Sequence, residues 1–200
     1  MGSTAPFSVT VAPAVDRFER SEWASAFRNV EQELTDVFLT PVRGTIPPDL
    51  VGTLYRNGPG RLERNGQRVH HPFEGDGMIT ALRWQEGAVA LSNRFVRTAG
   101  WQEEEAAGKV LYRGVFGSQK PGGPLANAFD LRLKNIANTG VVQLGDQLLA
   151  LWEAAEPHAL DPRTLESHGI SLLGGVLKKG EAFSAHPRFD PGHHDRPRMV

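Results

Sequence analysis

The stretch GVVQLGDQLLALW at residues 140–152 contains two apolar runs separated by a two-residue Gly-Asp loop. The first run, residues 140–144, and the second, residues 147–152, are rich in Val and Leu. Two such runs around Gly145-Asp146 indicate a β-hairpin, because this loop suits the tight turn that joins antiparallel strands. We therefore expect a protein built from short antiparallel strands.

Segments on the N-terminal side of this hairpin show the same pattern of short apolar runs separated by turn residues. Residues 52–56 predict a strand, and Asn57-Gly58-Pro59-Gly60 predicts a turn after it. Residues 78–84 and 88–97 predict two further strands joined at Glu86-Gly87. Strands at this spacing are typical of an all-β sandwich, barrel or propeller.

The composition limits the classes of protein to consider. The chain has 200 residues, a formal net charge of −1 and no cysteine. A disulfide scaffold and a thiolate metal site are therefore excluded, and the charge balance offers no general attraction for nucleic acid. No apolar run is long enough for a membrane-spanning helix. The first basic residue is Arg17, so we expect no secretory signal and a cytoplasmic protein.

Two segments depart from the strand pattern. We expect residues 1–39 to form an N-terminal arm and a short helix that carries Trp23, Phe27 and Val30 on one face. Residues 40–200 would then form the β domain. Within it, residues 116–135 have a helical pattern, whose apolar face either packs on the core or meets lipid.

Residue chemistry alone points to few reactive groups. The seven histidines fit no short metal-binding motif, and His186 precedes a proline at the end of an apolar stretch. Glu153 follows an apolar strand, so it either faces solvent or binds a partner such as an imidazole N–H. Residues 72–77 resemble a calcium loop only loosely, and a tight turn is the simpler interpretation.

Six short motifs follow one another along the chain, at residues 52–60, 71–78, 94–98, 135–139, 151–153 and 183–187. In this order they resemble the carotenoid cleavage oxygenases, over about residues 40–191. The stretch 112–135 is most similar to the bacterial apocarotenoid oxygenases of that family.

The resemblance implies a seven-bladed β-propeller with helical cap segments. A blade takes about 40–45 residues. The chain is therefore expected to hold only the N-terminal portion of such a propeller, with fewer than four blades. As it stands, a chain of this kind is expected to be truncated, inactive alone and poorly stable, because an open arc of blades leaves strand edges unpaired.

The same resemblance implies site residues. His186 matches one of four histidines that hold Fe(II) in the family, and Glu153 matches a glutamate that orients another of those histidines. Thr139 matches a threonine whose methyl group crowds one open position on the metal. The aromatic residues that match the lining of the substrate tunnel are Phe27, Phe73, Phe116 and Trp152.

The implied reaction inserts both atoms of O2 across the central 15,15′ double bond of an apocarotenoid, giving two carbonyl products, one of them retinal. Because a polyene must be extracted from a bilayer, we expect peripheral membrane contact through an apolar patch at the tunnel mouth. That patch comprises Val115, Phe116, Leu125, Phe129 and Leu133. Two alternatives remain open: a stilbene-cleaving dioxygenase of the same family, and a non-enzymatic fragment that binds lipid or carotenoid without iron.

Overall fold

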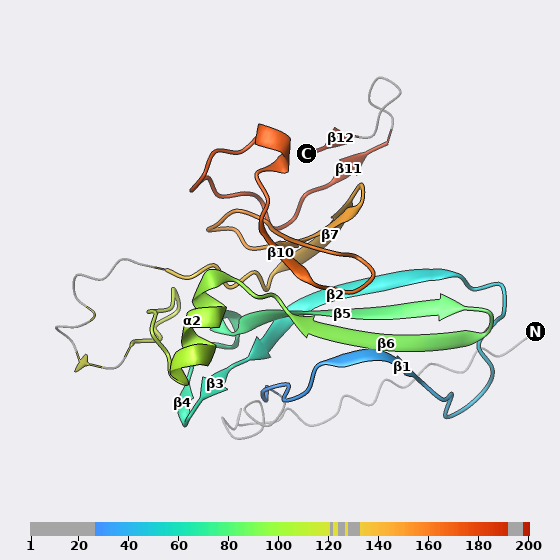
Figure 1. The fold of residues 1–200 in the computed structure, drawn as a ribbon, viewed down its shortest axis with the longest axis horizontal. Helices are drawn as coiled ribbons and strands as arrows, with labels where there is room; N and C mark the ends of the chain where they lie inside the picture. Colours follow the sequence, from blue (N-terminus) through green and yellow to red (C-terminus); the bar gives the residue numbers. More distant parts are fainter. Residues whose placement is uncertain (1–26, 121, 124–126, 128–132, 192–197) are drawn as a thin grey trace, which may run out of the picture.

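A computed structural model describes residues 27–120, 122–123, 127, 133–191 and 198–200, which form two four-stranded antiparallel sheets (Figure 1). The first sheet has the order β1 (Leu34–Phe38), β6 (Ala88–Phe95), β5 (Asp76–Gln85) and β2 (Gly52–Arg61). The second has the order β10 (Ser167–Ile170), β9 (His158–Leu160), β8 (Gln147–Leu151) and β7 (Gly140–Leu144).

Shorter elements complete the described part. Two-stranded ribbons pair β3 (Glu63–Arg64) with β4 (Gln67–Arg68), and β11 (Phe189–Asp190) with β12 (Arg198–Met199). The helical elements are α2 (Ala99–Ala107) and two short 3-10 turns, η1 (Pro72–Glu74) and η2 (Leu173–Gly175).

The hairpin expected at residues 140–152 is confirmed as β7 and β8, which pair from Leu144 opposite Gln147. Gly145 takes a left-handed φ of 60°, as the tight turn requires. Residues 148–151 are all buried, so β8 has no polar face. Alternate side chains of β8 enter two different core clusters, one on each face of the sheet, which explains why this run is continuously apolar rather than alternating.

The strands expected at residues 78–84 and 88–97 are confirmed as β5 and β6, with the turn at Glu86-Gly87. The turn expected at residues 57–60 is wrong, because β2 continues through it to Arg61 and pairs with β5 there. Pro59 has no N–H to donate to a sheet, but β2 is an edge strand of its sheet, where a proline is tolerated.

The N-terminal expectation fits the structure poorly. Most of the helix expected around Trp23 lies outside the described residues, but residues 27–33 contain no helix. Residues 34–38 form β1, which pairs with β6, so a strand of the first sheet precedes the boundary expected at residue 39. The Glu33 carboxylate accepts a hydrogen bond from the Phe95 backbone N–H, which further attaches this segment to the sheet.

The helix α2 was missed, although its ends carry clear signals. The Thr98 hydroxyl accepts the Trp101 N–H as an N-cap, and Gly108 closes the helix in the left-handed conformation. In the segment expected to be helical from residue 116, residues 116–120 are irregular, and most of the remainder lies outside the described residues.

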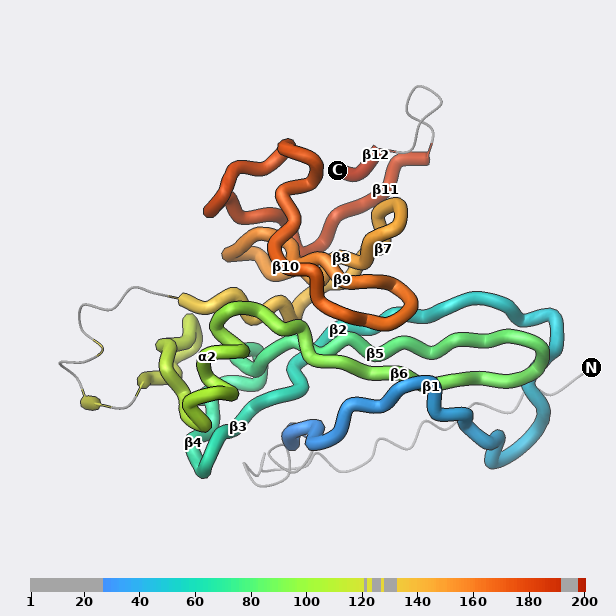
Figure 2. The backbone as a smooth tube through the Cα atoms, in the orientation of Figure 1, coloured from blue at the N-terminus to red at the C-terminus, as the bar shows by residue number. Residues whose placement is uncertain are grey.

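The two sheets meet along β2 and β7 (Figure 2). The Asn57 side-chain amide donates to the carbonyls of Ala137 and Gly140, at 2.8 and 2.7 Å. Gly77 donates its N–H to the Ile136 carbonyl, and a Cβ at Gly77 would lie only 2.1 Å from the Ala137 oxygen. This close approach brings the chain segment after residue 135 against the first sheet and forms the floor of a cleft.

Candidate active site

An open cavity of about 720 Å³ lies where the two sheets meet. It is lined by Asn57, Gly58, Pro59, Phe73, Val115, Phe116, Asn138, Thr139, Trp152, Glu153, Ala154 and His186. Residues of β2, of η1 and of the irregular segments that flank the second sheet therefore line the same cavity. Seven of these lining residues were singled out from the sequence, namely Phe73, Val115, Phe116, Thr139, Trp152, Glu153 and His186.

His186 and Glu153 contact each other on this wall. His186 Nε2 lies 3.2 Å from Glu153 Oε1, and their side chains are 70% and 53% exposed. The sequence expectation that Glu153 orients a histidine other than His186 stays a prediction, and within the described residues the carboxylate contacts His186. The two residues meet because the segment containing Ala185 passes so close to β7 that a Cβ at Gly140 would lie 2.1 Å from the Ala185 oxygen.

Thr139 extends this polar group by one residue. Its hydroxyl lies 3.3 Å from Glu153 Oε2 and 3.1 Å from Asn138 Oδ1. The Asn138 amide donates in turn to the carbonyls of Phe73 and Gly75, at 2.8 and 2.7 Å. The threonine is thus held between the glutamate and the backbone around η1.

The aromatic lining comes from segments far apart in the sequence. The rings of Phe73 and Phe116 lie edge to face, with centroids 6.0 Å apart. Trp152 is buried and follows directly after β8. Phe27, by contrast, is not part of the cavity lining, and its carbonyl accepts a hydrogen bond from Arg68.

The expected membrane patch is only partly visible. Val115, Phe116 and Leu133 are each close to half exposed. Leu125 and Phe129 lie outside the described residues. Among the helices that the structure describes, none has the length and apolar character needed to cross a membrane.

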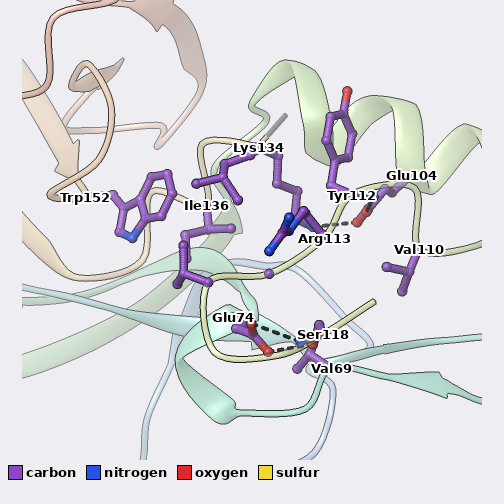
Figure 3. Close-up of a pocket in the computed structure, with 13 residues that line it drawn as sticks. Val69, Glu74, Glu104, Val110, Tyr112, Arg113, Ser118, Lys134, Ile136 and Trp152 are labelled. Atoms are coloured by element: carbon purple, nitrogen blue, oxygen red, sulfur yellow. Dashed lines mark hydrogen bonds and ion pairs between the residues drawn. The ribbon is translucent and has the colours of Figure 1, made fainter. Parts of the chain in front are cut away.

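A smaller, mostly apolar pocket of about 30 Å³ shares Val115 and Trp152 with the main cavity (Figure 3). Beneath it lies a cluster of charged side chains that the sequence analysis missed. Lys134 Nζ contacts Glu104 Oε2 and lies 2.8 Å from Asp76 Oδ1, while Arg64 contacts both carboxylates at 2.9 and 2.8 Å. Arg64, Asp76 and Glu104 are buried, and the Lys134 side chain is only 9% exposed. The four are mutually paired, so the cluster holds α2 against the first sheet. Glu104 Oε1 also accepts the backbone N–H groups of Leu111 and Tyr112, which fixes the chain that leaves the helix.

The described residues do not form a complete metal site. In the ranges that the structure covers, no three His, Asp or Glu side chains gather as metal ligands would. His186 contributes one accessible imidazole, a donor that suits Fe(II). The turn interpretation of residues 72–77 is confirmed as η1, and its acidic residues Glu74 and Asp76 are buried against donors of the protein itself.

Two adjacent four-stranded antiparallel sheets, with a histidine–glutamate pair in the cavity beside them, correspond to the N-terminal part of a β-propeller of the oxygenase class. The chain belongs to the family described as retinal pigment epithelial membrane protein, which matches residues 27–196.

Individual relatives agree with this assignment. The apocarotenoid-15,15′-oxygenase of Synechocystis is 51% identical over 183 residues, covering 91% of this chain and 37% of that protein. Resveratrol cleavage oxygenase 1 of Aspergillus fumigatus is 36% identical, covering 78% of this chain and 30% of that protein.

The solved structures bear out the fold. A glutamate-to-glutamine mutant of the Synechocystis apocarotenoid oxygenase superposes with a TM-score of 0.84 at 49% identity, covering 91% of this chain and 38% of that chain. That enzyme is a seven-bladed propeller, and the present chain corresponds to its N-terminal part, as expected. A cobalt-substituted form of the same enzyme has a TM-score of 0.84 at 51% identity, over 90% of this chain and 38% of that one. The chain thus spans less than two fifths of the length of these relatives.

Proposed function

We propose that the complete protein is a non-haem Fe(II) dioxygenase that cleaves the central 15,15′ double bond of apocarotenoids to give retinal. The observation that carries this proposal is the single cavity that gathers His186, Glu153, Thr139 and three aromatic side chains from distant parts of the chain. The relative with 51% identity, named an apocarotenoid-15,15′-oxygenase, supports the substrate class.

The residues of this chain would have separate roles. His186 would hold the metal through a neutral imidazole nitrogen, and bound Fe(II) would supply the position at which O2 is activated. Glu153 would accept an imidazole N–H and so fix the orientation and basicity of a ligand. Thr139 would limit the space beside the metal, since the Glu153 contact holds its side chain in place.

The lining of the cavity suits a polyene. Phe73, Phe116 and Trp152 present flat aromatic surfaces, and a polyene offers π-faces with no hydrogen-bonding group along its length. In the overall reaction one C=C bond is broken and each carbon receives one oxygen atom of O2. Four electrons pass from the alkene to O2, and no external reductant is needed.

A stilbene-cleaving activity is the second candidate, because resveratrol cleavage oxygenases match the chain at 33–36% identity. Such a substrate carries phenol groups that need polar partners. The cavity has the side chains of Asn57, Asn138 and Thr139 on its wall, but Asn57 and Asn138 already donate to backbone carbonyls. This favours the apolar substrate.

The test uses the protein from the complete reading frame, purified with iron. We expect an apocarotenal to be converted to retinal, detected by chromatography, and 18O from labelled O2 to enter both carbonyl products. Conversion of resveratrol instead of the apocarotenal would indicate a stilbene-cleaving dioxygenase. A protein that binds the apocarotenal without cleaving it, and that takes up no iron when iron is supplied, would support the non-enzymatic alternative. Residues 1–200 expressed alone are expected to be inactive.

We further propose a cytoplasmic location with peripheral membrane contact. Val115, Phe116 and Leu133 are substantially exposed, and the first two also line the cavity. An apolar patch at the mouth of the cleft would let a polyene pass from the bilayer without crossing water.

A further inference from the structure

The rings of Phe73 and Phe116, which line the cleft, pack against the ring of His71, and these three residues form the aromatic group. The His71 ring lies 4.7 Å from that of Phe73 and 4.9 Å from that of Phe116, measured between centroids. Phe73 and Phe116 are 61% and 51% exposed. Rings with this much exposure are held only in part by their own packing, so their positions depend on the backbone that carries them.

The carboxylate of Glu74 binds that backbone on both sides. Its Oε1 accepts the N–H groups of Phe116 at 2.6 Å and of Ser118 at 3.3 Å. Its Oε2 accepts the His71 N–H at 3.1 Å. The same oxygen accepts the Ser118 hydroxyl at 2.5 Å, and Figure 3 shows Glu74 and Ser118 facing each other. Glu74 is only 3% exposed, and four donors satisfy its buried charge.

The loop of residues 114–118 is shaped around this carboxylate. Gly114 donates its N–H to the Ser118 carbonyl at 2.9 Å, which closes the loop. A Cβ at Gly114 would lie 1.8 Å from Glu74 Oε1, so only glycine lets the chain pass over the carboxylate. The Ser118 hydroxyl also accepts the His70 N–H at 2.5 Å, which ties the loop to the chain before η1.

We propose that Glu74 is a positioning residue, whose buried carboxylate holds the loop 114–118 against η1 so that the aromatic group grips the polyene at the cleft mouth. The first part, that Glu74 holds the loop, is argued from the structure alone. The second part, that the aromatic group contacts a polyene, rests on the proposed function. A carboxylate suits this task because both oxygens only accept hydrogen bonds, and all four groups facing it are donors. A glutamine would turn an NH2 group toward two of those donors.

The first test measures the loop without any assay of activity. In the full-length protein, tryptic cleavage after Arg113 reports opening of the loop, with cleavage after Lys178 in the same digest as the internal reference. Glu74→Gln should speed cleavage after Arg113 by about tenfold or more, the size expected when hydrogen bonds to a buried charge are lost. Glu166→Gln makes the same chemical change at an exposed position and should leave the rate unchanged.

A second variant covers the case in which Glu74→Gln does not fold, as judged by circular dichroism. Ser118→Ala removes only the hydroxyl that joins Glu74 Oε2 to the His70 N–H, and it should speed the same cleavage by a smaller factor. Cleavage after Arg113 at the wild-type rate in every folded variant would overturn the proposal.

The second test separates binding from chemistry. For an apocarotenal, Glu74→Gln and Ser118→Ala should raise KM by roughly tenfold and change kcat by less than about twofold, because the aromatic group contacts the substrate away from the reacting bond. A loosened loop with unchanged KM would overturn the grip on substrate. If the wild-type protein fails to turn over apocarotenals, the proposed function fails, while the proteolysis still decides whether Glu74 holds the loop.

Discussion

Glu153 Oε1 lies 3.2 Å from His186 Nε2, in a pair whose side chains are both more than half exposed. An exposed contact of this kind contributes little to stability, because water competes for both groups and two side chains must be ordered. The pair can therefore open at low cost. His186 Nε2 is then available to a metal, and Glu153 to another imidazole N–H.

Replacement of His186 provides the most direct check of the proposed metal site. In the full-length protein, His186→Ala should abolish iron binding and retinal formation, since the imidazole is proposed as a direct ligand. Elemental analysis and chromatography measure the two effects. His168→Ala removes an exposed histidine of β10 and should change neither. Stoichiometric iron in the His186 variant would show that this residue is not a ligand.

Glu153→Gln should have a smaller effect than His186→Ala. A residue that orients a ligand typically accounts for about 10–100-fold in metal affinity or activity. Iron titration and initial rates would report the loss. Turnover equal to that of the wild-type protein would mean that the carboxylate merely faces solvent beside His186.

Two substitutions at Thr139 separate its hydroxyl from its methyl group. Thr139→Val keeps a branched side chain and loses the contact with Glu153 Oε2, whereas Thr139→Ala loses both. If the methyl group limits the space beside the metal, Thr139→Val should keep most of the activity and Thr139→Ala should produce a larger drop in product yield or a change in cleavage position. Product analysis by chromatography distinguishes these results. If Thr139→Val lost more activity than Thr139→Ala, the hydroxyl and not the methyl group would be the part of Thr139 that matters for activity.

The membrane proposal can be tested with liposomes. Phe116→Asp combined with Leu125→Asp should release the full-length protein from vesicles while its circular dichroism spectrum stays unchanged, because charged side chains are costly to bury in an acyl layer. Val176→Asp alters an exposed apolar residue beside η2, outside the patch, and is the control. Equal pelleting of the double variant and the wild type would argue against contact through this patch, and loss of folding would indicate a buried face.

We expect the free energy of unfolding to fall in acid because of His158. Its imidazole is buried in β9, and burial lowers its pKa from 6.5 to about 4 in the folded protein. Below pH 6.5 the unfolded chain therefore takes up a proton that the folded chain does not, so stability falls as the pH falls toward 4. From this residue alone, the free energy of unfolding should be about 2 kcal/mol lower at pH 5 than at pH 7. Urea unfolding at the two pH values measures it.

The control for that prediction is His158→Leu, which has no proton to gain. Its free energy of unfolding should vary less between pH 7 and pH 5 than that of the wild type, by the same amount. An identical pH dependence in both proteins would show that other groups cause the acid sensitivity.

The sequence by itself determined the strands whose signals are local. The hairpin of β7 and β8 followed from a Gly-Asp turn between two apolar runs, and β5 and β6 from a similar pattern. The local sequence wrongly predicted a turn at residues 57–60. Pairing of this segment with β5 keeps it in a strand despite the turn preference of Asn, Gly and Pro. The caps of α2, Thr98 and Gly108, were present in the sequence and were overlooked.

Only the tertiary structure decided which side chains meet. The sequence resemblance named His186, Glu153, Thr139, Phe73, Phe116 and Trp152, but their shared cavity exists because Gly77 and Gly140 let two chain segments approach the sheets closely. The tertiary structure also brings Glu153 against His186 and leaves Phe27 outside the cavity. It places the carboxylate of Glu74 against the loop of residues 114–118. Contacts between residues dozens of positions apart depend on the packing of whole sheets, and no local pattern of residues encodes that distance.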